Sequence, residues 1–133
     1  MLLLDTHVLI WLTEGSLRLG EAALDQINCA FEENQLGVAT ISFWEIAMLQ
    51  QKERIELNME LHAWRSDLLQ NGLQEITLAG TTAIRAGKLS KFHGDPADRM
   101  IVATAIENAA TLVTADKKIL AWDILQQKID ASK

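Results

Sequence analysis

The sequence predicts an α/β fold in which helices cover both faces of a mainly parallel sheet. Two observations predict it. Short apolar segments alternate along the chain with longer segments whose apolar residues recur every three or four positions. Clusters of glycine and proline, which would mark successive hairpins, are few. A chain of 133 residues, of which 49% are hydrophobic, has the size of one domain over residues 1–133 with a single core.

Four segments have the length and composition of strands, and a fifth is a weaker prediction. Residues 2–4 are three leucines, residues 36–39 and 111–113 are short and mostly apolar, and residues 73–78 alternate between apolar and polar side chains. Residues 128–130 form the weaker fifth strand. Right-handed crossovers would place the carboxyl ends of parallel strands, and the starts of the following helices, at the edge of the sheet where ligands bind.

Helical periodicity recurs between these strands. In the second predicted helix Leu24, Ile27 and Phe31 share one stripe and are expected to face inward. In the fourth, Leu61 and Trp64 share an inward stripe with Leu68, and Gly72 is expected to end the helix. The predicted helices are residues 8–12, 21–34, 43–51, 58–71, 81–90, 96–108 and 117–122.

The net charge of −6 argues against a protein that binds nucleic acid through a general basic surface. Its distribution changes this conclusion. Thirteen acids remain against twelve bases when five possible site acids are set aside, so much of the excess can belong to one pocket. Those five are Asp5, Glu45, Asp95, Asp98 and Asp116.

Cysteine content and hydropathy predict a cytoplasmic protein. Cys29 has no partner for an internal disulfide, which suits a reducing compartment. The apolar start lacks the basic segment of a signal peptide and is interrupted at residues 5–7. No segment approaches the roughly 20 apolar residues of a membrane span, so no membrane association is expected.

Four carboxylates follow a strand-like run or begin a helix-like one: Asp5, Glu45, Asp98 and Asp116. Each alone has an ordinary explanation as a helix cap. Ser42 and Glu45 have the spacing of a capping box. Asp95 would precede a helix with Pro96 at its first position, and Asp98 would lie in its first turn, where the helix dipole favours an acid.

The helical positions of two of these acids weaken the capping explanation. Glu45 shares a helical face with Leu49, and Asp98 shares one with Ile101 and Val102, so both acids point towards the core. Inward carboxylates lose hydration and repel one another unless a cation lies between them. Carboxylate oxygens without a cluster of cysteine and histidine favour Mg²⁺ or Mn²⁺ over zinc.

The segments that carry these acids resemble those of PIN-domain nucleases, and most closely those of VapC-type toxins. They occur in the family's order and spacing over nearly the whole chain, although residues 122–133 are less typical. The resemblance implies a PIN-like, three-layer α/β/α fold with a mainly parallel five-stranded sheet. The segments are LLLDTHVLIW at 2–11, ISFWEIAML at 41–49, DPADRMIVATA at 95–105 and LVTAD at 112–116.

The same resemblance implies Mg²⁺- or Mn²⁺-dependent endonucleolytic cleavage of RNA, a homodimer, and neutralisation by a small antitoxin. It implies that Asp5, Glu45 and Asp98 are the core acids, with Asp116 the fourth and Asp95 an auxiliary. We expect Asp5, Asp98 and Asp116 to hold one or two metal ions and Glu45 to position or deprotonate the attacking water.

Other polar residues near these acids have two interpretations each. The hydroxyls of Thr6, Ser42 and Thr114 can orient the acids or can simply cap turns. Four bases surround the segment 95–98 and are candidates for RNA phosphate contacts or for a solvated helix face. These bases are Arg85, Lys88, Lys91 and Arg99.

Histidines and tryptophans give weaker signals. His7 and His93 lie near the acids but lack a ligand cluster, and we interpret them as structural residues or hydrogen-bond donors. The four tryptophans are expected in the core. An exposed Trp44 or Trp64 would instead mark a groove for an antitoxin or a second subunit.

Three rival interpretations use the same sequence. A haloacid-dehalogenase-type phosphatase needs a second Asp two residues after Asp5, where this chain has His7. A receiver domain needs an Asp after the third strand, where the chain has Ala79 and Gly80. A catalytically silent PIN-like binding module is the third, and the complete set of acids argues against it.

Overall fold

The computed structural model describes residues 1–133 and has five strands and seven helices. The strands are β1 (Leu2–Leu4), β2 (Leu36–Ala39), β3 (Gln74–Ile76), β4 (Thr111–Thr114) and β5 (Lys128–Asp130). The helices are α1 (Thr6–Glu14), α2 (Glu21–Glu32), α3 (Thr40–Gln51), α4 (Leu61–Gln70), α5 (Gly80–Gly87), α6 (Pro96–Glu107) and α7 (Lys117–Ala121). Every predicted element is present, and the weakest strand prediction, residues 128–130, is confirmed.

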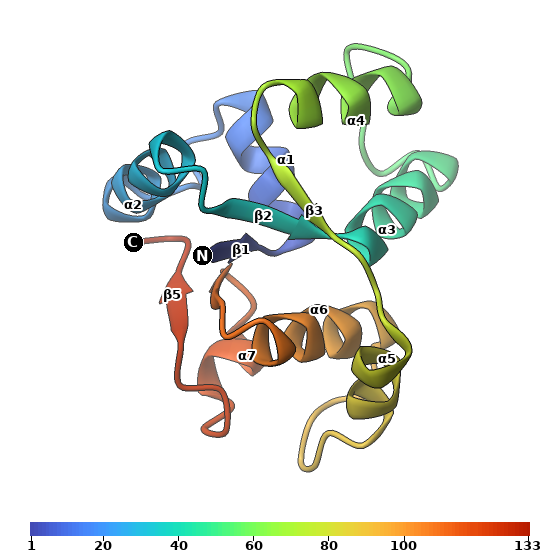
Figure 1. Cartoon of the computed structure of the whole chain (residues 1–133). Helices are drawn as coiled ribbons and strands as arrows, with labels where there is room; N and C mark the ends of the chain where they lie inside the picture. The colour runs from blue at the N-terminus through green and yellow to red at the C-terminus, as the bar shows by residue number, and fades with distance from the viewer.

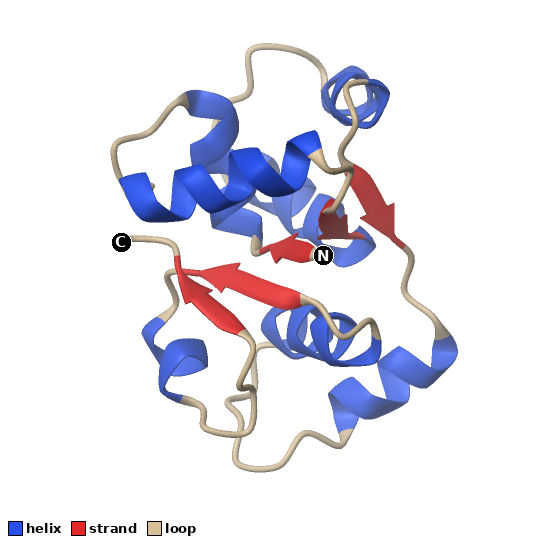
Figure 2. Cartoon of the chain, turned by 60° about the vertical axis from the view of Figure 1, so that its left-hand side comes forward, coloured by secondary structure: helices blue, strands red, loops and turns tan.

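The sheet is parallel throughout, in the order β3-β2-β1-β4-β5. Helices α1 to α4 lie on one side of it and α5 to α7 on the other (Figure 1; Figure 2). Alternate residues of the strands face opposite layers. Leu4 and Val113 join the core cluster beneath α1 to α4, whereas Leu3 and Leu112 join the cluster beneath α6 and α7. The predicted α/β/α fold is therefore confirmed.

The strand order creates a crevice between β1 and β4. The chain leaves β1 towards β2 but leaves β4 towards β5, so the two connections diverge to opposite sides of the sheet. Ligands in open α/β sheets bind at such a switch point, beyond the carboxyl ends of the strands. Asp5 follows β1 directly, and Asp116 lies two residues after β4.

Helices α3 and α4 each begin three residues away from the start that the sequence predicted. Helix α3 starts at Thr40, directly after β2, so Ser42 is buried inside the helix and not at its N-cap. Helix α4 starts three residues later than predicted, because Glu60 is its N-cap and accepts hydrogen bonds from the N–H groups of His62 and Ala63.

The predicted inward stripe of α2 is partly wrong. Ile27 is buried, but Phe31 is 42% exposed, and the other buried positions are Ala23 and Ala30. These residues form the buried face of α2, and two of them are alanines that let the helix pack closely. Phe31 lies beside this face and points to the surface. None of the seven helices combines the length and the apolar composition that a membrane span requires.

Candidate active site

Five acids line one cavity of about 330 Å³ at the carboxyl edge of the sheet. They come from separate parts of the chain: the end of β1, helix α3, the start of α6 and the turn after β4. They are Asp5, Glu45, Asp95, Asp98 and Asp116, with His7, Trp11 and Ala115 completing the wall. None of the five forms an ion pair with a lysine or arginine.

Asp5 is the deepest of these acids, with only 7% of its surface exposed. One carboxylate oxygen, Oδ1, accepts a hydrogen bond of 2.8 Å from the N–H of Thr6. The other, Oδ2, accepts one of 2.6 Å from the hydroxyl of Thr114. Burial raises the pKa of Asp5 although both bonds and the charge of His7 oppose it, and the negative charge of Asp116 raises it further.

Hydroxyl groups hold the acids in position. The Thr114 hydroxyl donates to Asp5 and accepts a 3.0 Å hydrogen bond from the N–H of Asp116, so one side chain joins two acids. Thr6 donates from Oγ1 to Ser42 Oγ at 2.9 Å, which ties the start of α1 to α3. All three hydroxyl residues are fully buried. They therefore form a rigid support behind the carboxylates.

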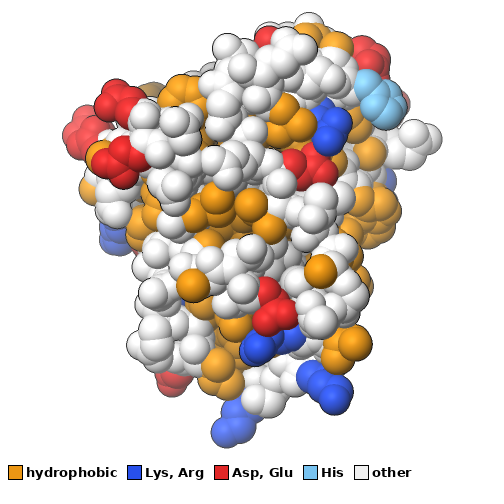
Figure 3. Space-filling model, in the orientation of Figure 1, with side chains coloured by type: hydrophobic (Ala, Val, Ile, Leu, Met, Phe, Trp, Pro, Cys, Tyr) orange, Lys and Arg blue, Asp and Glu red, His pale blue; other side chains and the backbone are white.

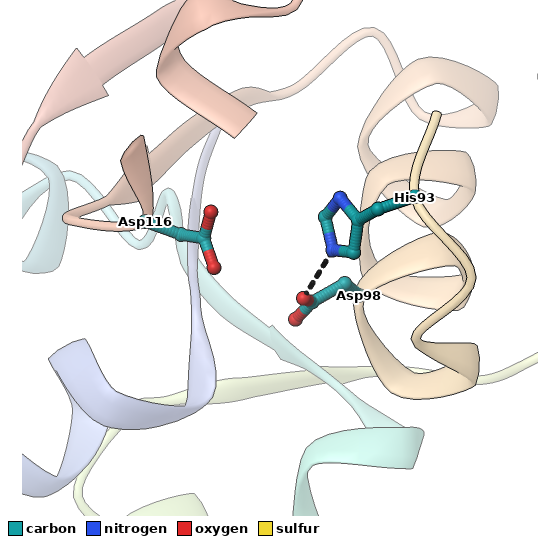
Figure 4. A group of neighbouring side chains, drawn as sticks. All are labelled: His93, Asp98 and Asp116. Atoms are coloured by element: carbon teal, nitrogen blue, oxygen red, sulfur yellow. Dashed lines mark hydrogen bonds and ion pairs between the residues drawn. The ribbon is translucent and has the colours of Figure 1, made fainter. Parts of the chain in front are cut away.

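The side chains of Asp98, Asp116 and His93 point towards one another (Figure 4). One potential ligand atom from each lies within 4.8 Å of the others, which is close enough to share one ion. His93 Nε2 and Asp98 Oδ2 share a hydrogen bond of 2.7 Å. Burial, followed by the negative charges of Asp5, Asp95 and Asp116, raises the pKa of Asp98 to about 6 against the effect of this bond.

Glu45 is half-buried on α3 and lines the same cavity. Its pKa is raised, first by burial and then by the negative charges of Asp5 and Asp95, with Thr6 and His7 opposing the shift. A glutamate in this environment holds a proton more readily than one in water. It is suited to take a proton from a water molecule bound in the cavity.

Capping and site roles coincide in three of the five acids. Asp5 caps α1, Asp95 caps α6 through the N–H of Asp98, and Asp116 caps α7 through the N–H groups of residues 118 and 119. The predicted capping box of Glu45 does not form, since the N-cap of α3 is Ala39. Burial and mutual repulsion still raise the pKa values of Glu45 and Asp98, the two acids whose core-facing positions were noted in the sequence, although nearby hydrogen bonds oppose part of the shift.

The cavity fits a divalent cation. Desolvated carboxylates with raised pKa values lie together without a lysine or arginine partner, and a bound cation would remove their repulsion. Carboxylate oxygens are the ligands that Mg²⁺ and Mn²⁺ prefer. His93, which we interpreted from the sequence as structural, belongs to this group. The sequence feature that could have predicted this is the position of His93 in the short loop that leads into the helix carrying Asp98.

The four predicted RNA-contacting bases do not reach the cavity as a group. Arg99 donates all five of its N–H groups to main-chain carbonyls of residues 86, 87, 89, 92 and 93, so it fixes the loop after α5 and has no donor left for phosphate. Arg85 pairs with Glu107 at 2.9 Å. Lys88 and Lys91 are exposed near this loop, and Figure 3 shows basic side chains at that lower end of the molecule.

Comparison with known proteins identifies the family. A sequence model of the PIN domain matches residues 2–124. The chain is a PIN domain. Ribonuclease VapC22 of Mycobacterium tuberculosis is 40% identical to it over 118 residues, which is 88% of each protein. The resemblance inferred from the four acid-bearing segments is thereby confirmed.

Solved structures share the fold of this PIN domain at lower sequence identity. A VapBC2 complex from Rickettsia felis, bound to a promoter DNA fragment, matches with a TM-score of 0.68 and 18% identity, covering 97% of each chain. A toxin-antitoxin complex from Klebsiella pneumoniae matches with a TM-score of 0.65 and 20% identity, covering 98% of each chain. A FitAB complex bound to a DNA fragment matches with a TM-score of 0.64 and 19% identity over 100% of this chain and 96% of the other.

Proposed function

We propose that this PIN domain is a metal-dependent endoribonuclease and the toxin of a toxin-antitoxin pair. One observation carries the proposal: acids from four parts of the chain share a cavity in which none of them pairs with a lysine or an arginine. The relative named a ribonuclease supports RNA as the substrate. The protein would act on RNA in the cytoplasm.

The acids have separate parts in the proposed reaction. Asp5, Asp98 and Asp116 would hold Mg²⁺ or Mn²⁺, with His93 beside them. When bound, the metal lowers the pKa of a water molecule and stabilises negative charge on the phosphate. Glu45 takes the proton of the water whose oxygen forms the new bond to phosphorus. The bond from phosphorus to the leaving 3′ oxygen of the ribose breaks, and this oxygen takes a proton from solvent water, so we expect a 5′-phosphate and a 3′-hydroxyl.

Thr114 and Thr6 would hold these acids in fixed positions relative to one another. Thr114 fixes Asp5 and the turn that carries Asp116, and Thr6 connects α1 to the helix that carries Glu45. Residues that orient metal ligands in this way change metal affinity or activity by roughly 10- to 100-fold when they are removed. Asp95 would add negative charge and hold the N-terminus of α6.

A cognate antitoxin and a second copy of the chain are the proposed protein partners. The solved structures that share this fold include toxin-antitoxin complexes, and this supports an antitoxin. Trp44 on α3 is 52% exposed and is one place where a partner could pack, whereas Trp64 is buried. Trp64 is therefore not available to contact a partner, although the sequence allowed that role for it.

The test is incubation of the purified protein with a mixture of RNA oligonucleotides in Mg²⁺ or Mn²⁺. We expect cleavage that stops in EDTA and stops in the Asp98→Asn variant. Cleavage that persists in either condition would contradict the metal-site mechanism. A protein that binds RNA without cutting any of it would favour the silent binding module.

A further inference from the structure

We propose that the groove between α1 and α3 holds a single-stranded stretch of the RNA beside the phosphate that is cut. Arg18, Lys52 and Arg54 would contact its phosphates, and Trp11 would stack on one of its bases. The inference rests on the proposed function and adds to it a path for the substrate. It also assigns the RNA contacts to residues of this groove and not to the basic residues near α5.

The groove is a second hollow, of about 920 Å³, that continues from the acid cavity. The two hollows share four lining residues: His7, Trp11, Glu45 and Asp95. A chain that lies in the groove therefore reaches the carboxylates without crossing a barrier. No other large hollow of the protein shares its walls with the acids.

Helical spacing gives the groove its length. On α1 the lining residues His7, Trp11 and Glu14 follow one another along one face, and Glu45 and Met48 do the same on α3, which Lys52 follows directly. Seven residues of helix rise about 10 Å. A groove of this length accommodates a short stretch of an RNA strand and its backbone. Its far end is lined by Arg18, Lys52 and Arg54.

The arginines in the groove are free to bind a ligand. Of the five arginines in the chain, Arg65 and Arg85 form ion pairs and Arg99 donates to main-chain carbonyls. Arg18 and Arg54 are the two whose side chains have no hydrogen bond or ion pair, and both are exposed in this groove. A guanidinium group offers paired donors that match a phosphate.

Two acids, Glu14 and Glu56, also line the groove. Neither lies within ion-pairing distance of its three bases, because the only ion pairs of the chain are elsewhere. Away from the cavity the groove thus carries three bases and two acids. This local excess of one positive charge is consistent with a protein of net charge −6 that admits RNA at one place only.

Trp11 selects for unpaired RNA. It is partly exposed and borders both hollows, so a base stacked on it lies next to the acids. Stacking on an aromatic side chain requires a base that is free of its own neighbours, which single strands and loops provide. The predicted substrate is therefore a single-stranded segment or loop.

The experiment compares two pairs of basic residues in a protein that binds RNA without cutting it. The parent is Asp98→Asn, and the probe is a fluorescent single-stranded RNA titrated over a series of salt concentrations. One variant carries Arg18→Gln and Arg54→Gln. The matched control carries Lys88→Gln and Lys91→Gln, which remove the same charge near α5. Thermal melts check that both are folded.

We expect the groove pair to lower RNA affinity by tenfold or more. Each lost phosphate contact should reduce the slope of log affinity against log salt by about 0.7, or about 1.4 for two. The control pair should change affinity by less than twofold, and Arg18→Lys with Arg54→Lys should restore the slope. Trp11→Leu should weaken binding by about tenfold, and Trp11→Phe should largely retain it.

Three results would overturn the inference. One is a control pair that loses as much affinity as the groove pair. Another is a groove pair that binds the RNA as tightly as the Asp98→Asn parent, which would leave the groove to another ligand such as the protein partner. In both cases the wild-type protein would still cut RNA, so the proposed function would survive. Absence of both RNA binding and cleavage would contradict the function and the inference together.

Discussion

Asp98 and Arg99 are neighbours on α6, yet they belong to opposite kinds of region. Asp98 faces a cavity of like charges, and its pKa is raised to about 6 by burial and by nearby acids. Arg99 faces the loop after α5 and makes five hydrogen bonds to its carbonyls. One residue is held in an unfavourable environment, and the other stabilises the structure around it.

The difference shows that the residues of the site destabilise the fold, whereas the residues around the site stabilise it. Repulsion and lost hydration at Asp98 persist only because the rest of the fold holds the helix in place. Arg99 is part of that support, since it ties the C-terminal end of α5 and the following loop to the start of α6. Substitution of the two neighbours should therefore have opposite effects on activity and on stability.

The largest effect is expected from Asp98→Asn. We expect RNA cleavage to fall by more than about 100-fold, because loss of a group that only orients a ligand already costs roughly 10- to 100-fold. The free energy of unfolding should stay the same or rise, since one repelling charge is removed. Initial rates and urea unfolding measure the two quantities. Asp25→Asn, at an exposed position on α2, is the control and should leave both unchanged.

Arg99→Ala should have the reverse result. Five hydrogen bonds from a charged donor are lost, and we expect the free energy of unfolding to fall by about 3 kcal/mol or more. Arg85→Ala removes an arginine whose ion pair is largely exposed, so its cost should be below about 1 kcal/mol. Equal destabilisation by the two substitutions in urea unfolding would show that Arg99 does not hold the loop.

Thr114→Val tests the support between two acids. The side chain keeps its shape but loses the hydroxyl that donates to Asp5 and accepts from the N–H of Asp116. Activity should fall by roughly 10- to 100-fold, and stability by about 1–3 kcal/mol because a buried carboxylate loses a donor. Thr114→Ser should recover most of both. A valine variant with normal kinetics would leave Thr114 with no role at the site.

The smallest expected effect is a dependence of stability on pH. In the metal-free protein Asp98 holds its proton up to a pH of about 6, whereas the unfolded chain releases it near 3.8. The folded state therefore binds more protons in this window, and stability falls as pH rises through it, by about 2–3 kcal/mol at most. Melting of wild type and Asp98→Asn between pH 4 and 7 should show a smaller fall in the variant, in which only the raised pKa values of Asp5 and Glu45 remain.

Most of the fold could be predicted from the sequence because its three central strands, β2, β1 and β4, are short and mostly buried. Runs such as the leucines of β1 have one stable place in an α/β protein, which is the centre of a parallel sheet. The start of α3 could not be predicted, because β2 passes into the helix at Thr40 without a turn residue between them. Phe31 was misplaced because small residues beside it take the buried stripe.

The sequence predicts that the acids lie close together, because the carboxyl ends of the strands in a parallel sheet meet at one edge. No comparable rule predicts where a basic residue on a helix or a loop will lie relative to the site. Arg99 lies one residue from Asp98 but points about 100° away around the helix, and only the path of the loop after α5 decides what it meets. For the same reason the groove bases Arg18 and Arg54, in loops after α1 and α3, gave no signal in the sequence.

The most direct test of the central claim is calorimetric titration of the RNA-free protein with Mn²⁺. The claim is that carboxylates from separate elements form one metal site. We predict that wild type binds Mn²⁺ and releases protons at pH 6, and that Asp98→Asn and Asp116→Asn each weaken binding at least about tenfold. Asp123→Asn, an exposed acid outside the cavity, should bind like wild type. Equal binding by all four proteins would contradict the claim.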